Sequence, residues 1–140
     1  MISEKLSSLL KKVKTIAIVG ASSNPHRDSY KVMKFLIDSG YKVFPVNPTE
    51  TNRMILNQKC YSNLNDIQEK IDMVDVFRAK GAVMGVTQEA IQIGAKVLWT
   101  QLGVVHEKAS ELAKSAGLKV IMNRCPKIEL EKQYLVSRLK

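Results

Sequence analysis

The sequence contains few cysteines and no long hydrophobic run. Two cysteines, Cys60 and Cys125, stand among 140 residues, which is too few for a disulfide framework and favours a reducing cytosol. No stretch approaches the roughly 20 consecutive apolar residues that a transmembrane helix needs. Residues 1–14 place their basic side chains after the apolar ones, so we expect no secretory signal. These absences predict a cytoplasmic protein without a membrane span.

Motifs for metal binding and for nucleophilic catalysis are also missing. The chain has two histidines, no cluster of His and Cys at metal-ligand spacing, no G-x-S-x-G nucleophile elbow and no G-K-S or G-K-T phosphate loop. We therefore expect neither a metal site nor a Ser–His hydrolase. Because the sequence shows no set of residues typical of a catalytic site, we favour a binding module over an enzyme.

Basic residues outnumber acidic ones in this sequence. The chain carries 22 Lys and Arg against 13 Asp and Glu, a formal net charge of +9. This balance favours an anionic partner, such as nucleic acid, an anionic membrane or a multiply phosphorylated small molecule. The basic residues form no stripe interleaved with aromatic side chains, so we do not expect nucleic acid.

What is present is a regular alternation of short β-branched runs and helical patterns. Strands are expected at 15–20, 41–46, 73–77, 96–102 and 118–122, with helices between them at 29–39, 81–93 and 107–116. Further helices are expected at about 2–13 and about 126–139, and residues 49–58 are expected to form a loop, with a short strand near 59–62. This order predicts one α/β domain over residues 1–140, with a doubly wound, mainly parallel sheet of about five to six strands and helices on both faces.

The most informative segment is TIAIVGASSNPHRDSY, residues 15–30. A buried strand ends at Gly20, a polar loop follows, and a helix then begins at about Ser29. In α/β proteins this order builds a phosphate cradle, because the first N–H groups of the helix point at the anion. Arg27 adds a guanidinium group suited to phosphate oxygens. Only one glycine is present, so the segment lacks the G-x-G-x-x-G pattern of an ordinary NAD site.

The other strand ends refine the prediction, because ligands of such sheets bind beyond the carboxyl ends of the strands. The second strand ends in Asn47-Pro48, where an NAD site normally has an acidic residue for the ribose diol. A phosphorylated ribose would not be repelled there, and Arg53 is a candidate source of positive charge. Asp72 and Asp75, around the third strand, are expected to be structural.

The strand ends GASSNPHRDSY, VNP, VDVFR, GAKVLWTQLG and NRCPKIE occur in this order and, taken together, resemble the small stand-alone CoA-binding domain proteins. These are similar to the N-terminal domain of the succinyl-CoA synthetase α subunit. The resemblance covers about residues 15–129 and implies a Rossmann-like domain that holds CoA or an acyl-CoA. In the synthetase, the phosphorylated histidine and the nucleotide site lie outside this domain, so the resemblance implies a binding protein rather than a ligase.

The resemblance also implies which residues touch the cofactor. The pyrophosphate would lie on the loop and helix start formed by Gly20, Ala21, Ser22, Ser23, Asn24, Pro25, Arg27, Ser29 and Tyr30. The adenine and 3′-phosphoribose would lie near Asn47 and Pro48, and the pantetheine arm would pass Phe77 and Arg78 toward Thr100 and Gln101. Members of the family often have a basic residue where this chain has Thr49, so Arg53 is the candidate for the 3′-phosphate.

The sequence is also compatible with two other functions. The same cradle would serve an NADP-dependent oxidoreductase, although no base or proton relay is visible in the sequence. Cys125 stands between Arg124 and a helix start at Pro126-Lys127, a setting that lowers a thiol pKa, so a redox protein forming a mixed disulfide with CoA is the second alternative. The sequence leaves open a homo-oligomer or a partner protein.

Overall fold

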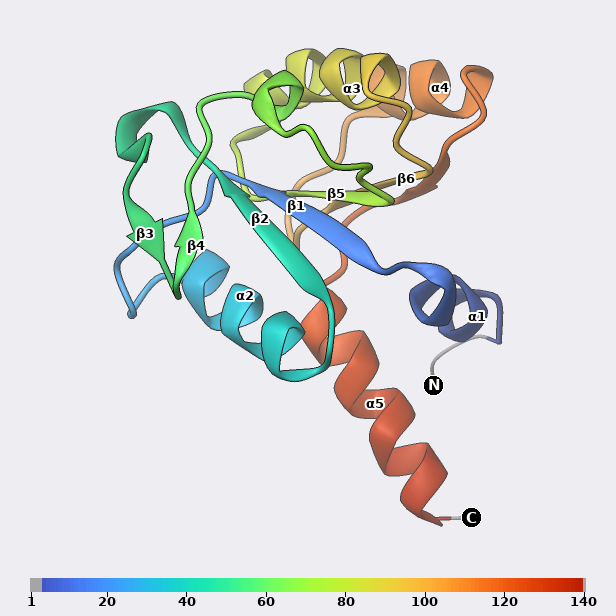
Figure 1. Cartoon of the computed structure of the whole chain (residues 1–140). Coiled ribbons are helices and arrows are strands. Elements are labelled where there is room, and N and C mark those ends of the chain that lie inside the picture. Colours follow the sequence, from blue (N-terminus) through green and yellow to red (C-terminus); the bar gives the residue numbers. More distant parts are fainter. Residues whose placement is uncertain (1–3, 140) are drawn as a thin grey trace.

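The centre of the fold is a parallel sheet of five strands in the order β2-β1-β5-β6-β7, seen in a computed structural model that describes residues 4–139, with side chains described for residues 6–132. The strands are β1 (Thr15–Val19), β2 (Lys42–Val46), β5 (Met73–Val76), β6 (Val97–Thr100) and β7 (Lys119–Ile121). All four pairings in this sheet are parallel. The predicted α/β architecture is therefore confirmed (Figure 1).

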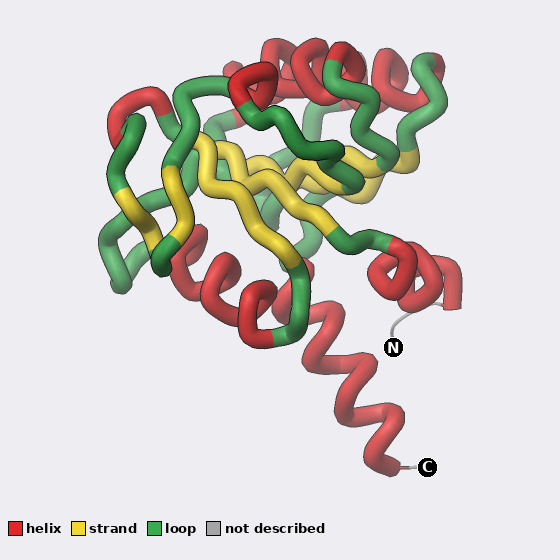
Figure 2. The backbone as a smooth tube through the Cα atoms, in the orientation of Figure 1, coloured by secondary structure: helices red, strands yellow, loops and turns green. Residues whose placement is uncertain are grey.

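Helices cover both faces of the sheet, which forms a single twisted layer between them (Figure 2). Helices α1 (Glu4–Lys12), α2 (Asp28–Asp38) and α5 (Pro126–Leu139) lie on one face, and α3 (Val83–Gln92) and α4 (Glu107–Ser115) lie on the other (Figure 1). Residues 2 and 3 of the expected first helix lie outside the described residues. No described helix is long and apolar enough to cross a membrane.

The strands are apolar on both faces because helices bury both. Side chains alternate along β5, so that Met73 belongs to the core under α1, α2 and α5, while Val74 and Val76 belong to the core under α3 and α4. Trp99 of β6 is fully buried in the first of these cores, and its indole N–H donates to the Arg124 carbonyl at 2.7 Å. Pro45 is tolerated within β2 because β2 is an edge strand of this sheet.

The segment after β2 is more ordered than the sequence suggests. A 3-10 turn (Pro48–Glu50) leads into a hairpin of β3 (Met54–Ile55) and β4 (Gln58–Lys59), where a loop was predicted over 49–58. That prediction was wrong because the polar composition of the segment hid its turn chemistry: Leu56 and Asn57 both have positive φ, as a two-residue hairpin turn requires.

The strand order fixes where a ligand can lie. From β1 the chain goes to β2 on one side, and the later strands β5, β6 and β7 add on the other side. Such a reversal is a topological switch point, and here it falls between β1 and β5. The loops that leave these two strands diverge to opposite faces, which opens a crevice at the carboxyl edge of the sheet.

Candidate functional site

Gly20 is the point at which three strand ends meet. Its N–H donates to the Val46 carbonyl of β2 at 2.8 Å, and a Cβ built on it would lie only 2.2 Å from the Phe77 carbonyl oxygen after β5. Its φ of +91° is also one that a side chain rarely adopts. The glycine therefore allows the loops after β1, β2 and β5 to approach one another closely.

The loop after Gly20 is held in shape by its own hydrogen bonds. Asn24 donates its N–H to Ser22 Oγ at 3.0 Å and accepts the His26 N–H on Oδ1 at 2.9 Å. Helix α2 then begins at Asp28, and its N-cap residue Arg27 makes no side-chain capping bond. The Arg27 side chain therefore leaves the N–H groups of Asp28 and Ser29 uncapped, whereas the Tyr30 N–H donates to the Arg27 carbonyl at 3.1 Å.

A polar pocket of about 600 Å³ lies over this loop. Its lining comes from the loop, the start of α2 and the residues after β2 and β5: Gly20, Ala21, Ser22, His26, Arg27, Asp28, Ser29, Asn47, Thr49, Glu50 and Phe77. Of the other predicted residues, Ser23, Asn24 and Pro25 lie in the cradle loop, Tyr30 lies in α2 and Pro48 in the 3-10 turn, and none of them lines the pocket.

Asn47 lines the pocket but its carboxamide is engaged within the protein. Its Nδ2 donates to the Ala21 carbonyl at 2.8 Å, and its Oδ1 accepts the N–H and the hydroxyl of Thr49 at 3.0 and 2.9 Å. Asn47 therefore ties the end of β2 to the cradle loop. An aspartate could not donate to the Ala21 carbonyl in this way, which gives a structural reason for the missing acid.

An acidic residue nevertheless stands in the polar pocket, and sequence reasoning missed it. The Glu50 carboxylate accepts the Ser23 N–H at 3.0 Å and also the Ser23 hydroxyl, and its side chain is 11% exposed. Arg53 Nη1 lies 4.0 Å from the same carboxylate, while its own side chain is largely exposed. The acid stands four residues beyond Val46, the last residue of β2, so a search for an acid at the strand end does not reach it.

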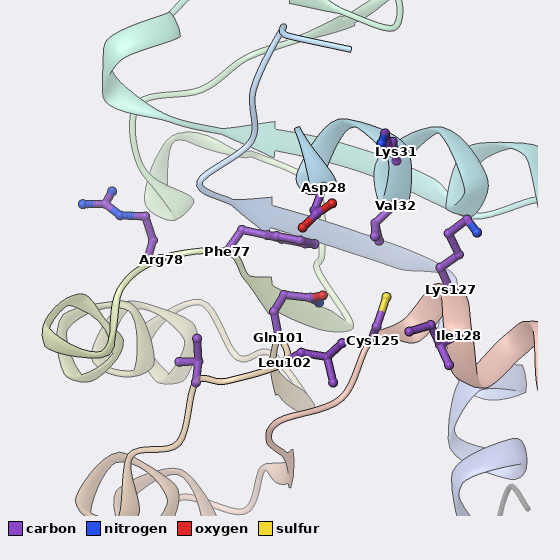
Figure 3. Close-up of a pocket in the computed structure, with 11 residues that line it drawn as sticks. Asp28, Lys31, Val32, Phe77, Arg78, Gln101, Leu102, Cys125, Lys127 and Ile128 are labelled. Carbon is purple, nitrogen blue, oxygen red and sulfur yellow. The ribbon is translucent and has the colours of Figure 1, made fainter. Parts of the chain in front are cut away.

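A second pocket, of about 500 Å³, lies on the other side of Phe77. It is lined by α2, by the ends of β5 and β6 and by the start of α5: Asp28, Lys31, Val32, Phe77, Arg78, Gln101, Leu102, Val104, Cys125, Lys127 and Ile128. Phe77, Gln101 and Cys125 converge on this space, whereas Arg78 points away from it (Figure 3). The stem of Arg78 instead lies beside the cradle, because its Cδ would be 3.1 Å from a Cβ at Gly20. Phe77 and Asp28 line both pockets.

Thr100, Asp72 and Asp75 make hydrogen bonds within the protein and line neither pocket. The buried Thr100 hydroxyl donates to the Val104 carbonyl at 2.6 Å and so shapes the loop after β6. Asp72 accepts the N–H groups of Lys14 and Thr15, at 2.9 and 3.3 Å. Asp75 is fully buried and accepts a hydrogen bond of 2.5 Å from Gln101 Nε2.

Cys125 does not have the activated thiol that the sequence suggested. It lines the second pocket but is only 9% exposed. Burial raises its pKa above the usual value, although the N–H groups of Ile128 and Lys127 act in the opposite direction. The expectation of a lowered pKa was wrong because the thiol is enclosed by apolar side chains. Among the described residues, no group of His, Cys, Asp and Glu is placed to hold a metal ion.

A glycine turn at the switch point of a parallel sheet, with a polar and a less polar pocket beside it, defines the class of the fold as a Rossmann-like α/β domain. The chain belongs to the CoA binding domain family, whose pattern matches residues 14–131. The family predicted from the strand ends is therefore confirmed.

The chain is similar both to proteins of about its own length and to part of much longer ligases. The chain is 40% identical to the uncharacterised protein YneT of Bacillus subtilis over 89% of this chain and 90% of that protein. It is 28% identical to an ADP-forming acetate–CoA ligase of Methanocaldococcus jannaschii over 80% of this chain but only 17% of the ligase. A solved structure of a hypothetical protein from Pyrococcus horikoshii superposes with a TM-score of 0.88 at 42% identity, covering 92% of this chain and 89% of the other.

Proposed function

We propose that the protein binds CoA or an acyl-CoA along the crevice at the carboxyl edge of its sheet. The observation that carries the proposal is the order of the two pockets on either side of Phe77: a polar one at the helix start and a less polar one near Gln101 and Cys125. CoA has the same order, with phosphates at one end and an uncharged pantetheine arm and thiol at the other. Membership of the CoA binding domain family supports this assignment.

In this proposal residues 1–140 act as one cytoplasmic CoA-binding domain. The pyrophosphate lies on the cradle loop and on the N–H groups of Asp28 and Ser29 at the start of α2, with Arg27 and Arg78 beside it. The pantetheine arm passes Phe77 and reaches Gln101 in the second pocket. The related acetate–CoA ligases carry a similar segment within much longer chains, so the proposal extends only to binding and not to ligation.

The proposal is tested by titrating the protein calorimetrically with CoA, acetyl-CoA, NADP and NAD. Saturable binding of CoA or acetyl-CoA, with weaker binding of both dinucleotides, is the expected result. Selective NADP binding would instead support an oxidoreductase, an alternative that the family match does not favour. A Cys125–CoA disulfide is likewise not favoured, because the thiol is buried and its pKa is raised.

A further inference from the structure

Asp75 occupies an unusual position for a carboxyl group. It lies in β5, near the middle of the sheet, directly between Ile18 of β1 and Trp99 of β6, and it is 0% exposed. Alternation along the strand places its side chain on the same face as Met73, under α2 and α5. Burying an apolar side chain at this position would cost much less free energy, so the presence of a carboxyl group there requires an explanation.

The two oxygens of Asp75 have unequal partners. Oδ1 accepts the hydrogen bond from Gln101 Nε2 at 2.5 Å, whereas Oδ2 is buried without a hydrogen-bond partner. Burial raises the pKa of Asp75 to about 8, despite the opposing effect of the Gln101 hydrogen bond. The group is therefore mainly uncharged at neutral pH, and ionisation would place an uncompensated carboxylate in the core.

Gln101 links this buried carboxyl group to the second pocket. Gln101 is the first residue after β6, is 8% exposed and lines that pocket. Since Nε2 is held by Asp75, the carboxamide has a fixed orientation, with its tip lying between Phe77 and Cys125 (Figure 3). A fixed amide at this place offers the ligand a polar contact whose geometry depends on Asp75.

No neighbouring positive charge in the described part of the chain stabilises the ionised form of Asp75. On its own face, its strand neighbours Ile18 and Trp99 are uncharged, and the only causes of its pKa shift are burial and the Gln101 hydrogen bond. The charged and titratable residues that line the second pocket or are buried on this side of the sheet are Asp28, Lys31, Cys125, Lys127 and Glu129, whereas the Arg78 side chain points away (Figure 3). Of these, Lys127 pairs with Glu131, and Glu129 pairs with Arg124 at 3.1 Å.

We propose that Asp75 is a positioning residue for the pantetheine end of the ligand: its buried Oδ1 holds the Gln101 carboxamide in the orientation in which the carboxamide contacts the arm. This inference rests on the proposed function and adds to it a determinant of affinity that lies inside the protein core. Asp75 itself touches no ligand, because the second pocket does not include it in its lining.

The test compares acetyl-CoA, which has no free thiol, with adenosine 3′,5′-bisphosphate, which lacks the pantetheine arm. If the Asp75–Gln101 hydrogen bond positions the amide, removal of this bond lowers the acetyl-CoA affinity about fivefold. The affinity for the bisphosphate does not share this fall, so the ratio of the two affinities isolates the arm.

Four variants complete the design. Asp75→Leu removes the acceptor for Gln101 and lowers the affinity ratio, whereas Asp75→Asn keeps an acceptor and restores the wild-type ratio. Gln101→Leu lowers acetyl-CoA affinity and leaves bisphosphate affinity unchanged. Asp72→Asn is the matched control: Asp72 lies at the opposite end of β5 from the pockets, so this variant retains the wild-type affinity ratio.

A wild-type affinity ratio in a folded Asp75→Leu protein would overturn the inference. Full acetyl-CoA affinity in Gln101→Leu would overturn it as well, even if no Asp75 variant folds. Failure of the wild type to bind either ligand would instead overturn the proposed function.

Discussion

At the scale of single residues, Gly20 meets two constraints at one backbone position. It has a φ of +91° and it faces the Phe77 carbonyl oxygen at a distance that leaves no room for a Cβ. Gly117 has the same φ of +91° with nothing within 4 Å of a built Cβ, so it separates the two effects.

Gly20→Ala is therefore expected to destabilise the protein by at least ~2 kcal/mol more than Gly117→Ala, which pays only the backbone cost of about 1 kcal/mol. Urea unfolding of both variants measures the difference. Equal losses would show that the loops after β1 and β5 do not depend on their close approach.

The burial of Asp75 leads to a second prediction at this scale, which concerns how the stability of the protein depends on pH. Its pKa is raised to about 8 in the folded protein, whereas an aspartate in the unfolded chain titrates near 4. Between these values the folded state holds the extra proton, so this group makes the free energy of unfolding fall as pH rises, by at most about 1.4 kcal/mol per pH unit.

Asp75→Asn is accordingly expected to reduce this fall between pH 5 and pH 7.5 and to raise stability at neutral pH. Asp72→Asn is the control: burial alone would raise the pKa of Asp72, but the N–H groups of Lys14 and Thr15, with smaller effects from Lys96 and Lys70, lower it overall. Stability due to Asp72 is lost only as pH falls through its lowered pKa, so its removal leaves the slope above pH 5 unchanged. Identical slopes in the wild type and Asp75→Asn would contradict the burial of an uncharged carboxyl group.

At the scale of elements, the segment that joins β2 to the hairpin brings an acid to the cradle. The Glu50 carboxylate accepts the Ser23 N–H at 3.0 Å, and it lines the pocket in which we place the pyrophosphate. A carboxylate and a phosphate at one set of donors repel each other, at a cost on the order of 1 kcal/mol for partly exposed charges.

Glu50→Gln is expected to strengthen CoA binding about fivefold, because the amide oxygen still accepts from Ser23 while the negative charge is removed. Glu111→Gln, on α4, makes the same change in net charge away from the polar pocket and serves as the control. Weaker binding in Glu50→Gln would assign the carboxylate a direct bond to the ligand, such as one to a ribose hydroxyl.

The elements also show what could be predicted from sequence. The strands and helices around β1 and β5 were predicted within one or two residues, because β-branched runs and glycine stops mark them clearly. The hairpin at 54–59 and the position of Glu50 were missed, since both depend on how the chain turns after Pro48. The state of Cys125 was misjudged for a related reason: flanking charges are visible in a sequence, whereas enclosure by distant apolar side chains is not.

At the scale of the whole molecule, the net charge of +9 favours an anionic ligand. The attraction acts between partly exposed charges, so added salt screens it. We expect CoA affinity to fall by about tenfold between 0.05 and 0.5 M NaCl. Sucrose at equal osmolality is expected to leave the affinity unchanged, and an affinity independent of salt would show that the phosphates contribute little.

The most direct test of the account is a calorimetric titration of the wild-type protein with CoA, with NADP as the matched ligand. The two share an adenosine diphosphate carrying an additional phosphate on its ribose, and they differ in what extends from the pyrophosphate toward Phe77 and Gln101. The account predicts saturable binding of one CoA per chain and markedly weaker binding of NADP. Absence of CoA binding at millimolar concentration, or equal affinity for both ligands, would contradict it.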